Sequence, residues 1–499
     1  MLAAAVMGMS ACAGTKGAQV TDSGAGETSL KTYDWSEASL YEAEDGTMLG
    51  AAKTESAVAG FSGNGYVSGL ASDGDGVSLK IAVEEDGHYD LAFSTCSADG
   101  GHKDNYVWVD GENVGTISSE GTVFADSVIG RVYLTAGEHT VEVKKYWGWA
   151  LIDSVKIKHS DDIDPAIYSV SAELVNPNAT DNTKRLFHYL CDIYGKQILS
   201  GQYCDTGMIG SENMAIWKTT GGEYPAVLGL DFIEYTPSRV ANGSVGHATE
   251  LAINYWENGG IVTFCWHWNA PEKYLTGQWY SGFNTAYTNI DLAKIMNGED
   301  PEGYDLLMED IDAIAAQISI LQEAGAPILW RPLHEASGGW FWWGASGPEA
   351  YKQLYVLLYE KLTNEYGLNN LIWVWNGQDP DWYPGDEYVD IVGEDLYPGE
   401  HVYTPQTNKF FEAVDYTEGR KMVVMSENGC LFDPDQALRD GAMWGFFCTW
   451  SGEFVVKNTS IVALSEQYTE ESMIQKVYAS DLVITRSELP DLKNYPIEE

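Results

Sequence analysis

Two different rhythms of apolar and polar residues divide the chain. Between Leu40 and His159, short stretches of alternating apolar and polar residues are separated by Gly-rich turns. Alternation with a period of two is typical of strands that cover a core with one face. The segments with this pattern are GVSLKIAV, GHYDLAFST, NYVWVDG, RVYLT, EHTVEVKKY and ALIDSVKIK. Many short strands with regular turns predict an all-β sandwich of the jelly-roll type over residues 37–159.

The rhythm changes after residues 160–170, an acidic linker that contains a proline. Eight nearly continuous apolar runs now alternate with stretches long enough for helices: QILSGQY, YPAVLGLD, GIVTFCWH, APILWRPL, NLIWVWNG, VDIVGEDLY, KMVVMSENG and MWGFFCTWSG. Eight strand–helix units predict an α/β fold over residues 171–490, a (β/α)8 TIM barrel. In such barrels the active site lies at the carboxyl ends of the strands.

Polar and aromatic residues gather where the predicted barrel strands end. They include Gln202, Asp231, His267, Arg331, His334, Glu335, Trp375, Asn376, Asp395, Tyr397, Glu427 and Trp450. Acids beside tryptophans suit a polysaccharide, because aromatic rings stack on the C–H faces of sugars. The densest segment is 326–344, APILWRPLHEASGGWFWWG. Glu335 alone would more often be a structural partner of Arg331 than a catalytic acid.

The motif WRPLHE followed by GGWFWWG resembles the acid/base segment of glycoside hydrolase family 26, whose members are mostly β-mannanases. The resemblance extends over most of the chain from about Ser171 onward. It implies that Glu335 is the acid/base and that Glu427, in the segment MSENG, is the nucleophile of a retaining mechanism. Retaining enzymes hold their two carboxylates about 5–5.5 Å apart. Asp231, Glu394 and Asp395 are competing carboxylates, and strand parity should turn Glu394 away from Asp395.

The same resemblance implies residues that bind substrate. Tyr397 matches a tyrosine that hydrogen-bonds the nucleophile, Trp340 a substrate-stacking position, and Trp450 the floor under the sugar. The other substrate-binding residues expected at the barrel rim are Asp231, His267, Arg331, His334 and Asp395. No cofactor or metal is expected for catalysis, because two carboxylates suffice to hydrolyse an acetal.

The first domain is similar to carbohydrate-binding modules of family 35, or of the related family 6, through the segments YEAEDG, GEHTVEVKK and ALIDSVKI. This resemblance implies a structural Ca²⁺ held by Glu42, Glu44 and Asp153. Glu42 and Glu44 are two apart on one predicted strand, so they would face the same side, as a cation that prefers several oxygens requires. The alternative is a pair of solvated edge carboxylates.

Three aromatic residues of the module, Tyr146, Trp147 and Trp149, lie in the segment KKYWGWA, which we interpret as a turn. Aromatic residues on a Gly-containing turn are poorly placed to join a core. We therefore expect a platform on which sugars stack, with at least one of the three packing under the loop instead.

Composition narrows the range of partners. The chain has 28 Lys+Arg and 74 Asp+Glu, which gives a formal net charge of −46 at pH 7. This charge disfavours nucleic acid and anionic membrane surfaces. With 18 Trp and 30 Tyr, the chain is better suited to an uncharged polysaccharide on which aromatic rings stack, and the family resemblance implies that this partner is β-mannan and manno-oligosaccharides. We expect a monomer.

The first residues predict export. Residues 1–12 are small and apolar up to Cys12 and look like a lipoprotein signal with its lipid-attachment cysteine, although the charged n-region is missing. Residues 13–36 are rich in Gly, Ala, Ser, Thr and acids, as in a flexible linker. Apolar runs of about twenty residues are missing from the rest of the sequence, so no membrane-spanning helix is expected. The protein is expected outside the cell, secreted or attached to the cell surface.

The leading hypothesis is an exported, retaining endo-β-1,4-mannanase that degrades mannan, galactomannan and glucomannan and carries a mannan-binding module. An endo-β-1,3-1,4-glucanase and a β-1,3-xylanase on the same scaffold remain open, as do exo action and the tolerance of galactose branches. A non-catalytic glycan-capture lipoprotein is a hypothesis from another class. The joint presence of Glu335, Glu427 and Tyr397 argues against it, because a binding protein needs no pair of opposed carboxylates.

Overall fold

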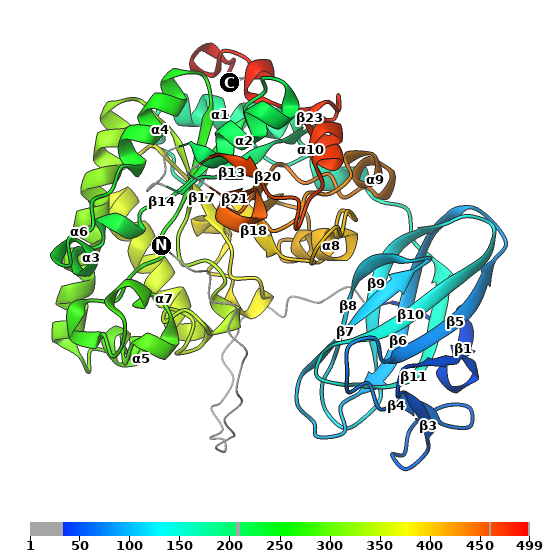
Figure 1. Ribbon diagram of the computed structural model, residues 1–499. Helices are drawn as coiled ribbons and strands as arrows, with labels where there is room; N and C mark the ends of the chain where they lie inside the picture. Colours follow the sequence, from blue (N-terminus) through cyan, green and yellow to red (C-terminus); the bar gives the residue numbers. More distant parts are fainter. Residues whose placement is uncertain (1–32, 206–209, 459–460, 498–499) are drawn as a thin grey trace. The chain divides into compact units, whose positions relative to one another are not determined.

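The computed structural model describes residues 33–205, 210–458 and 461–497. The predicted signal, 1–12, and most of the predicted linker lie outside the described residues. Two folded regions follow one another along the chain, an all-β region and an α/β region (Figure 1).

The first region is a sandwich of two antiparallel sheets. Its strands are β1 Ser39–Glu42, β2 Thr47–Leu49, β3 Lys53–Glu55, β4 Tyr66–Ser68, β5 Gly76–Val83, β6 Gly87–Cys96, β7 Lys103–Val109, β8 Glu112–Ser119, β9 Ala125–Leu134, β10 Gly137–Trp147 and β11 Leu151–His159. One sheet has the order β3-β4-β11-β6-β9, with β1 paired to β11, and the other has the order β2-β5-β10-β7-β8. The predicted sandwich is confirmed.

Alternation along the strands explains the core of the sandwich. In β5 the side chains of Val77, Leu79 and Ile81 are buried between the sheets, while Lys80 is exposed. Strand β8, ENVGTISS, was not predicted, because its residues are mostly polar. It lies at the edge of its sheet, where a strand needs few apolar residues.

The second region is a closed barrel of eight parallel strands, which confirms the predicted TIM barrel. The strands are β13 Gly201–Tyr203, β14 Val227–Asp231, β15 Ile261–Cys265, β16 Ile328–Arg331, β17 Leu371–Trp375, β18 Ile391–Leu396, β19 Met422–Asn428 and β20 Phe447–Thr449. Two small sheets pair β12 Ile198–Leu199 with β23 Val483–Ile484, and β21 Val456–Asn458 with β22 Ala463–Leu464.

Ten α-helices of the described residues belong to this region. They are α1 Asp181–Ile193, α2 Ser211–Thr220, α3 Pro237–Ala241, α4 Ala248–Glu257, α5 Leu292–Met296, α6 Pro301–Glu323, α7 Pro348–Tyr359, α8 Thr407–Asp415, α9 Pro434–Asp440 and α10 Glu471–Tyr478. The longest, α6, begins where Asp300 accepts a hydrogen bond from the Gly303 amide at 3.0 Å and Pro301 takes the first helical position. Both features are typical of helix starts.

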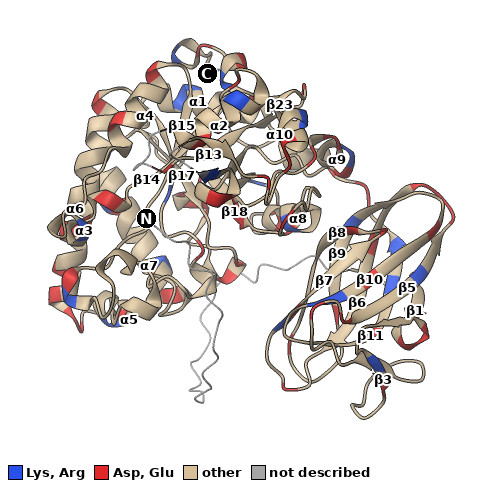
Figure 2. Cartoon of the chain, in the orientation of Figure 1, with Lys and Arg blue, Asp and Glu red and all other residues tan. Residues whose placement is uncertain are grey.

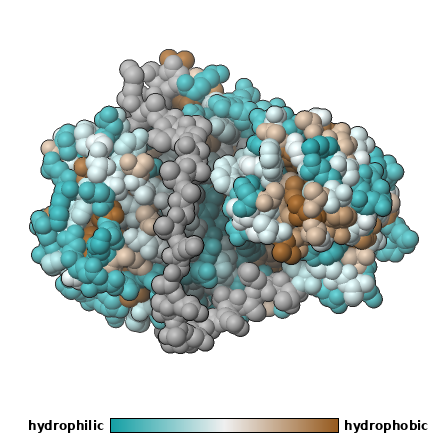
Figure 3. Space-filling view, turned by 90° about the horizontal axis from the view of Figure 1, so that it is seen from below, coloured by the Kyte–Doolittle hydropathy of each residue, from teal (hydrophilic) through white to brown (hydrophobic). Residues whose placement is uncertain are grey.

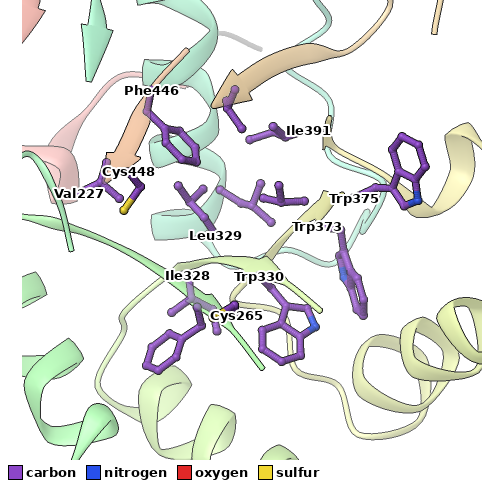
Figure 4. Packing of buried hydrophobic residues seen from close by; sticks show 14 of the residues in the cluster. Val227, Cys265, Ile328, Leu329, Trp330, Trp373, Trp375, Ile391, Phe446 and Cys448 are labelled. Atoms are coloured by element: carbon purple, nitrogen blue, oxygen red, sulfur yellow. The ribbon is translucent and has the colours of Figure 1, made fainter. Parts of the chain in front are cut away.

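The barrel strands are buried on both faces, which explains their continuous apolar sequences. In β16 the side chains of Leu329 and Trp330 point to opposite sides, Leu329 to the barrel interior and Trp330 to the helices (Figure 4). By strand alternation Arg331 lies on the same side as Leu329. Trp330 contacts Phe232 with ring centroids 5.7 Å apart. The parity of this strand therefore directs Arg331 to the centre of the barrel.

The face seen in Figure 3 is mostly hydrophilic, with an apolar area on the sandwich. Acidic residues are spread over both regions and visibly outnumber Lys and Arg (Figure 2). None of the described helices is long and apolar enough to span a membrane. The six described cysteines are free thiols.

Candidate active site

Two glutamates face each other at the carboxyl end of the barrel. Glu427 belongs to β19, the seventh strand, and Glu335 lies four residues beyond the end of β16, the fourth strand, so it is a loop residue rather than a strand end. Oxygens of Glu335, Asp395 and Glu427 lie within 4.8 Å of one another. This spacing suits a retaining glycosidase and leaves no room for the water that an inverting enzyme places between its carboxylates.

The turn that carries Glu335 is held in an unusual backbone conformation. Leu333 and Glu335 both have φ of 53°, in the left-handed region that residues other than glycine seldom adopt. The Glu335 amide donates to the Asn376 carbonyl at 2.8 Å, and the Trp343 indole donates to the His334 carbonyl at 2.8 Å. These bonds from neighbouring segments hold a conformation that is strained by itself.

Glu335 is placed to carry a proton. Burial raises the pKa of Glu335 well above its ordinary value, and the nearby charges of Asp395 and Glu427 raise it further. The Trp340 indole donates a hydrogen bond to Glu335 Oε2 at 2.8 Å. A carboxyl group that stays protonated near neutral pH can act as a general acid.

Glu427 has the opposite surroundings. Arg331 Nη2 donates to Glu427 Oε2 at 2.7 Å, and the Tyr397 hydroxyl donates to Glu427 Oε1. Two donors, one of them cationic, hold both oxygens of the carboxylate in place. Glu427 is therefore arranged as a nucleophile.

Arg331 lies beneath the site rather than along the cleft. Its side chain is fully buried, and its Nη1 donates to Asp395 and, at 3.1 Å, to Asn376 Oδ1. Its Nη2 also donates to the Tyr203 hydroxyl at 3.1 Å. We predicted that Arg331 binds substrate, but this burial instead places it where it can orient Glu427.

Asp395 is paired with the same arginine. It lies opposite Glu427 in the pairing of β18 with β19, and its Oδ1 accepts from the Ser426 hydroxyl at 2.7 Å. Burial raises the pKa of Asp395 to about 7, although Arg331 opposes this shift. Its side chain is fully buried, so it supports the site from below. The neighbouring Glu394 turns the other way, towards Gln378, as strand parity predicts.

Three further predicted residues meet on the other side of Glu335. His267 Nδ1 lies 2.6 Å from Asp231 Oδ2, and His267 Nε2 lies 3.3 Å from His334 Nε2. His334 is buried, whereas His267 and Asp231 are partly accessible. Trp450 is also partly accessible, with its ring centroid 5.7 Å from that of His267.

The aromatic loop after Glu335 buries three of its four large rings. Phe341, Trp342 and Trp343 are buried, and Trp342 donates to the Trp268 carbonyl at 2.6 Å. Only Trp340 of this cluster is exposed, at 38%. Trp340 and Tyr397, which is 40% exposed, thus offer accessible aromatic surface beside the two glutamates.

Sequence reasoning gave no role to Tyr203, Asn376 or Ser426, which hold Arg331, the Glu335 turn and Asp395. Their positions at or near the ends of predicted barrel strands could have indicated a role in the site, and Asn376 was noted among the rim residues for that reason. Nothing in single residues showed that they bond to Arg331 or Asp395.

The module presents its three predicted aromatic residues to solvent. Tyr146, Trp147 and Trp149 are 47%, 46% and 46% exposed, so none packs under the loop. Tyr146 and Trp147 end strand β10 rather than lying in a turn. The Tyr146 ring stacks on Tyr106 with centroids 4.2 Å apart, which keeps it in a fixed orientation.

The module's acidic residues surround the turn 62–65. Glu42 ends β1, while Glu44 lies in the following 3-10 turn, so our expectation of one continuous strand was wrong. The Ser62 hydroxyl donates to Glu42 Oε2 at 2.7 Å, and the Ser62 amide donates to Asp153 Oδ1 at 2.7 Å. Glu44 Oε2 is buried without a hydrogen-bond partner in the structure. Burial and the neighbouring acids raise the pKa of Glu42.

Comparisons with known proteins agree with both regions. Residues 175–488 match the model of glycosyl hydrolase family 26, and residues 39–160 match that of carbohydrate binding module family 35. The chain is 38% identical over 455 residues to a mannan endo-1,4-beta-mannosidase of Thermothelomyces thermophilus, covering 91% of this chain and 90% of that protein. It is 36% identical to mannan endo-1,4-beta-mannosidase B of Piromyces sp, covering 90% and 77%.

Among solved structures, the GH26-CBM35 beta-(1,4)-mannanase of Podospora anserina has a TM-score of 0.64 and 37% identity, covering 92% of this chain and 99% of that one. A ruminal GH26 endo-beta-1,4-mannanase has a TM-score of 0.63 and 30% identity, with the same coverage. With a matching model over more than half of its length and two acids placed for retaining hydrolysis, this chain belongs to glycosyl hydrolase family 26.

Proposed function

We propose that the enzyme cleaves internal β-1,4 linkages of mannan, galactomannan and glucomannan with retention of configuration. The observation that carries the proposal is the pair of close glutamates in different environments, Glu335 partly buried with a raised pKa, and Glu427 held by Arg331 and Tyr397. The similar proteins named as mannan endo-1,4-beta-mannosidases support the choice of sugar.

The first step forms a covalent glycosyl-enzyme. Glu427 attacks the anomeric carbon while Glu335 gives its proton to the departing glycosidic oxygen. Glu427 loses its negative charge as it forms the ester bond, and Glu335 becomes negatively charged as it gives up its proton. The Tyr397 hydroxyl, bonded to Oε1, and Arg331, bonded to Oε2, keep the Glu427 carboxylate oriented for the attack.

The second step reverses these roles. Glu335, now ionised, accepts a proton from water, which attacks the anomeric carbon and releases Glu427. The high pKa that made Glu335 an acid also makes its carboxylate an effective base. Trp340, bonded to Glu335 and exposed, is suited to stack against a sugar next to the bond that is cleaved.

We further propose that the module captures mannan through Tyr146, Trp147 and Trp149 and binds Ca²⁺ through Glu42, Glu44 and Asp153. Three carboxylates around one turn, with one buried oxygen lacking a partner, fit a cation that prefers oxygen ligands. The ion would offset the repulsion between these acids and fix the turn that they surround.

We also propose that the protein is a monomer and that it acts outside the cell, because its polymeric substrate is found there. The lipoprotein-like segment 1–12 supports export, with Cys12 as the attachment point of a lipid or the end of a removed signal.

The substrate can be tested with three soluble or suspended polymers. Reducing ends should be released from locust bean gum much faster than from barley β-glucan or β-1,3-xylan, and viscosity should fall early, as internal cleavage requires. Glu335→Gln should lose about 10²–10⁴-fold in rate, because general acid catalysis is removed. The matched control is Glu394→Gln, since burial raises the pKa of Glu394 to about 8 and Gln resembles the protonated group. Faster release from either alternative polymer would reassign the substrate.

Replacing Trp147 and Trp149 with Ala should weaken binding of the protein to insoluble mannan by about two- to tenfold for each ring, because stacking contributes roughly 0.5–1.5 kcal/mol per aromatic pair. Hydrolysis of short soluble oligosaccharides should stay unchanged, since these residues belong to the module. Undiminished pull-down of the double variant on mannan would place the binding surface elsewhere.

Calcium removal should lower the melting temperature of the module within the full chain. A ligand at 100 times its Kd stabilises the native state by about 2.7 kcal/mol, so addition of EDTA should move one calorimetric transition down by several degrees. Glu44→Gln should melt near the EDTA-treated temperature and respond little to calcium. A wild-type melting profile that EDTA leaves unchanged would contradict the metal site.

A further inference from the structure

Three side chains from consecutive barrel strands form a continuous chain of contacts that ends beside the acid/base. Asp231 ends β14, His267 lies two residues beyond β15, and His334 lies three residues beyond β16. The contacts are Asp231 Oδ2 to His267 Nδ1 at 2.6 Å and His267 Nε2 to His334 Nε2 at 3.3 Å. His334 directly precedes Glu335 in the chain.

At one end of this series of contacts, Asp231 determines which nitrogen of His267 carries the proton. Asp231 Oδ1 already accepts the amides of Ile233 at 2.8 Å and of His267 at 3.1 Å, so the carboxylate cannot rotate without losing both bonds. Its Oδ2 then faces His267 Nδ1 as an acceptor. His267 therefore carries a proton on Nδ1, and a neutral ring leaves Nε2 free to accept.

The His334 end fixes the second proton. His334 is 1% exposed, and burial lowers its pKa well below the ordinary value, with the charge of Arg331 acting in the same direction. A neutral His334 has one N–H group. Placed on Nε2, this proton makes the hydrogen bond to His267, whereas placed on Nδ1 it would have no acceptor. The positive charge of nearby Arg331 also favours the tautomer of His334 in which Nδ1 is unprotonated. In this tautomer Nδ1 presents a lone pair, whereas a protonated Nδ1 would present another N–H donor.

We propose that Asp231, His267 and His334 form a relay with one fixed direction of donation, from His334 to His267 and from His267 to Asp231. Asp231 is then a positioning residue that acts through both rings. The relay keeps His334 neutral, so no positive imidazolium charge stands beside Glu335 to favour its ionised form before the leaving oxygen takes the proton. This role in catalysis rests on the proposed glycosidase function, whereas the arrangement of protons does not.

The tautomers can be read directly by NMR of the full chain labelled with ¹⁵N in histidine. His267 should show a protonated Nδ1 and an unprotonated Nε2, and His334 the reverse. The two sets of signals are assigned by their loss in His267→Gln and in His334→Gln. Finding a doubly protonated His334, or His334 protonated on Nδ1, in the free enzyme would overturn the proposal whatever the substrate proves to be.

Asp231→Asn tests whether Asp231 directs the relay. The amide of Asn can turn its NH₂ group towards His267 Nδ1, so that Nδ1 must accept and the His267 proton moves to Nε2. The N–H groups of His267 and His334 would then face each other, and the hydrogen bond between the two rings would be lost. We expect this tautomer change in the spectrum and a fall in kcat of about 10- to 100-fold, comparable to the loss of a partner behind a functional histidine. KM should change much less, since the rings remain in place.

The matched control is Asp310→Asn. Asp310 is another buried aspartate, and it accepts a hydrogen bond from the Trp268 indole at 2.7 Å, on the loop that carries His267. This variant should keep both the wild-type tautomers and the wild-type kcat. If Asp231→Asn keeps them as well, or if Asp310→Asn changes them equally, the relay is excluded as the cause. A wild-type enzyme that is inactive on mannan but shows the predicted tautomers would refute the function and leave the relay intact.

Discussion

The buried guanidinium of Arg331 is the interaction on which the active site depends. A charge without access to water is costly unless several partners surround it. Arg331 has four, because its nitrogens donate to Glu427, Asp395, Asn376 and Tyr203. Since Asp395 and Glu427 lie opposite each other on adjacent strands, one cation holds both acids in fixed positions.

This arrangement divides the roles of the two catalytic glutamates. Glu427 receives donors from Arg331 and Tyr397, which hold its two oxygens in fixed positions. Glu335 stands within reach of the same acids but its side chain receives one bond, from the Trp340 indole, and burial and the repulsion by these acids raise its pKa. The fold creates this difference by taking Glu427 from within a strand and Glu335 from a strained turn beyond one.

Periodicity along the chain was sufficient to predict the sandwich and the barrel. The apolar runs that form β14 to β19 are continuous because both faces of those strands are buried. This pattern can be recognised from the residue types alone. Strand β8 escaped prediction because its pairing, rather than its composition, makes it a strand.

The site was predictable in its residue types but less so in its contacts. Arg331 was expected at the cleft, and the alternation of β16 instead turns it into the barrel interior, beneath the carboxylates. The sequence did not show which rings after Glu335 would be buried, and in the structure Trp342 and Trp343 are buried and donate to backbone carbonyls of Trp268 and His334. Hydrogen-bond partners such as Trp268 come from segments that are far apart in the sequence, so no local sequence pattern predicts them.

The assignment of the two glutamates can be tested by the configuration of an azide product. With a substrate that has a good leaving group, Glu335→Ala should still form the covalent intermediate, which azide then opens to give the β-azide with retained configuration. Glu427→Ala cannot form the intermediate, so azide in the vacated space should attack directly and give the inverted α-azide. NMR of the isolated products distinguishes the two anomers. The α-azide from Glu335→Ala, or full activity in both variants, would contradict the account.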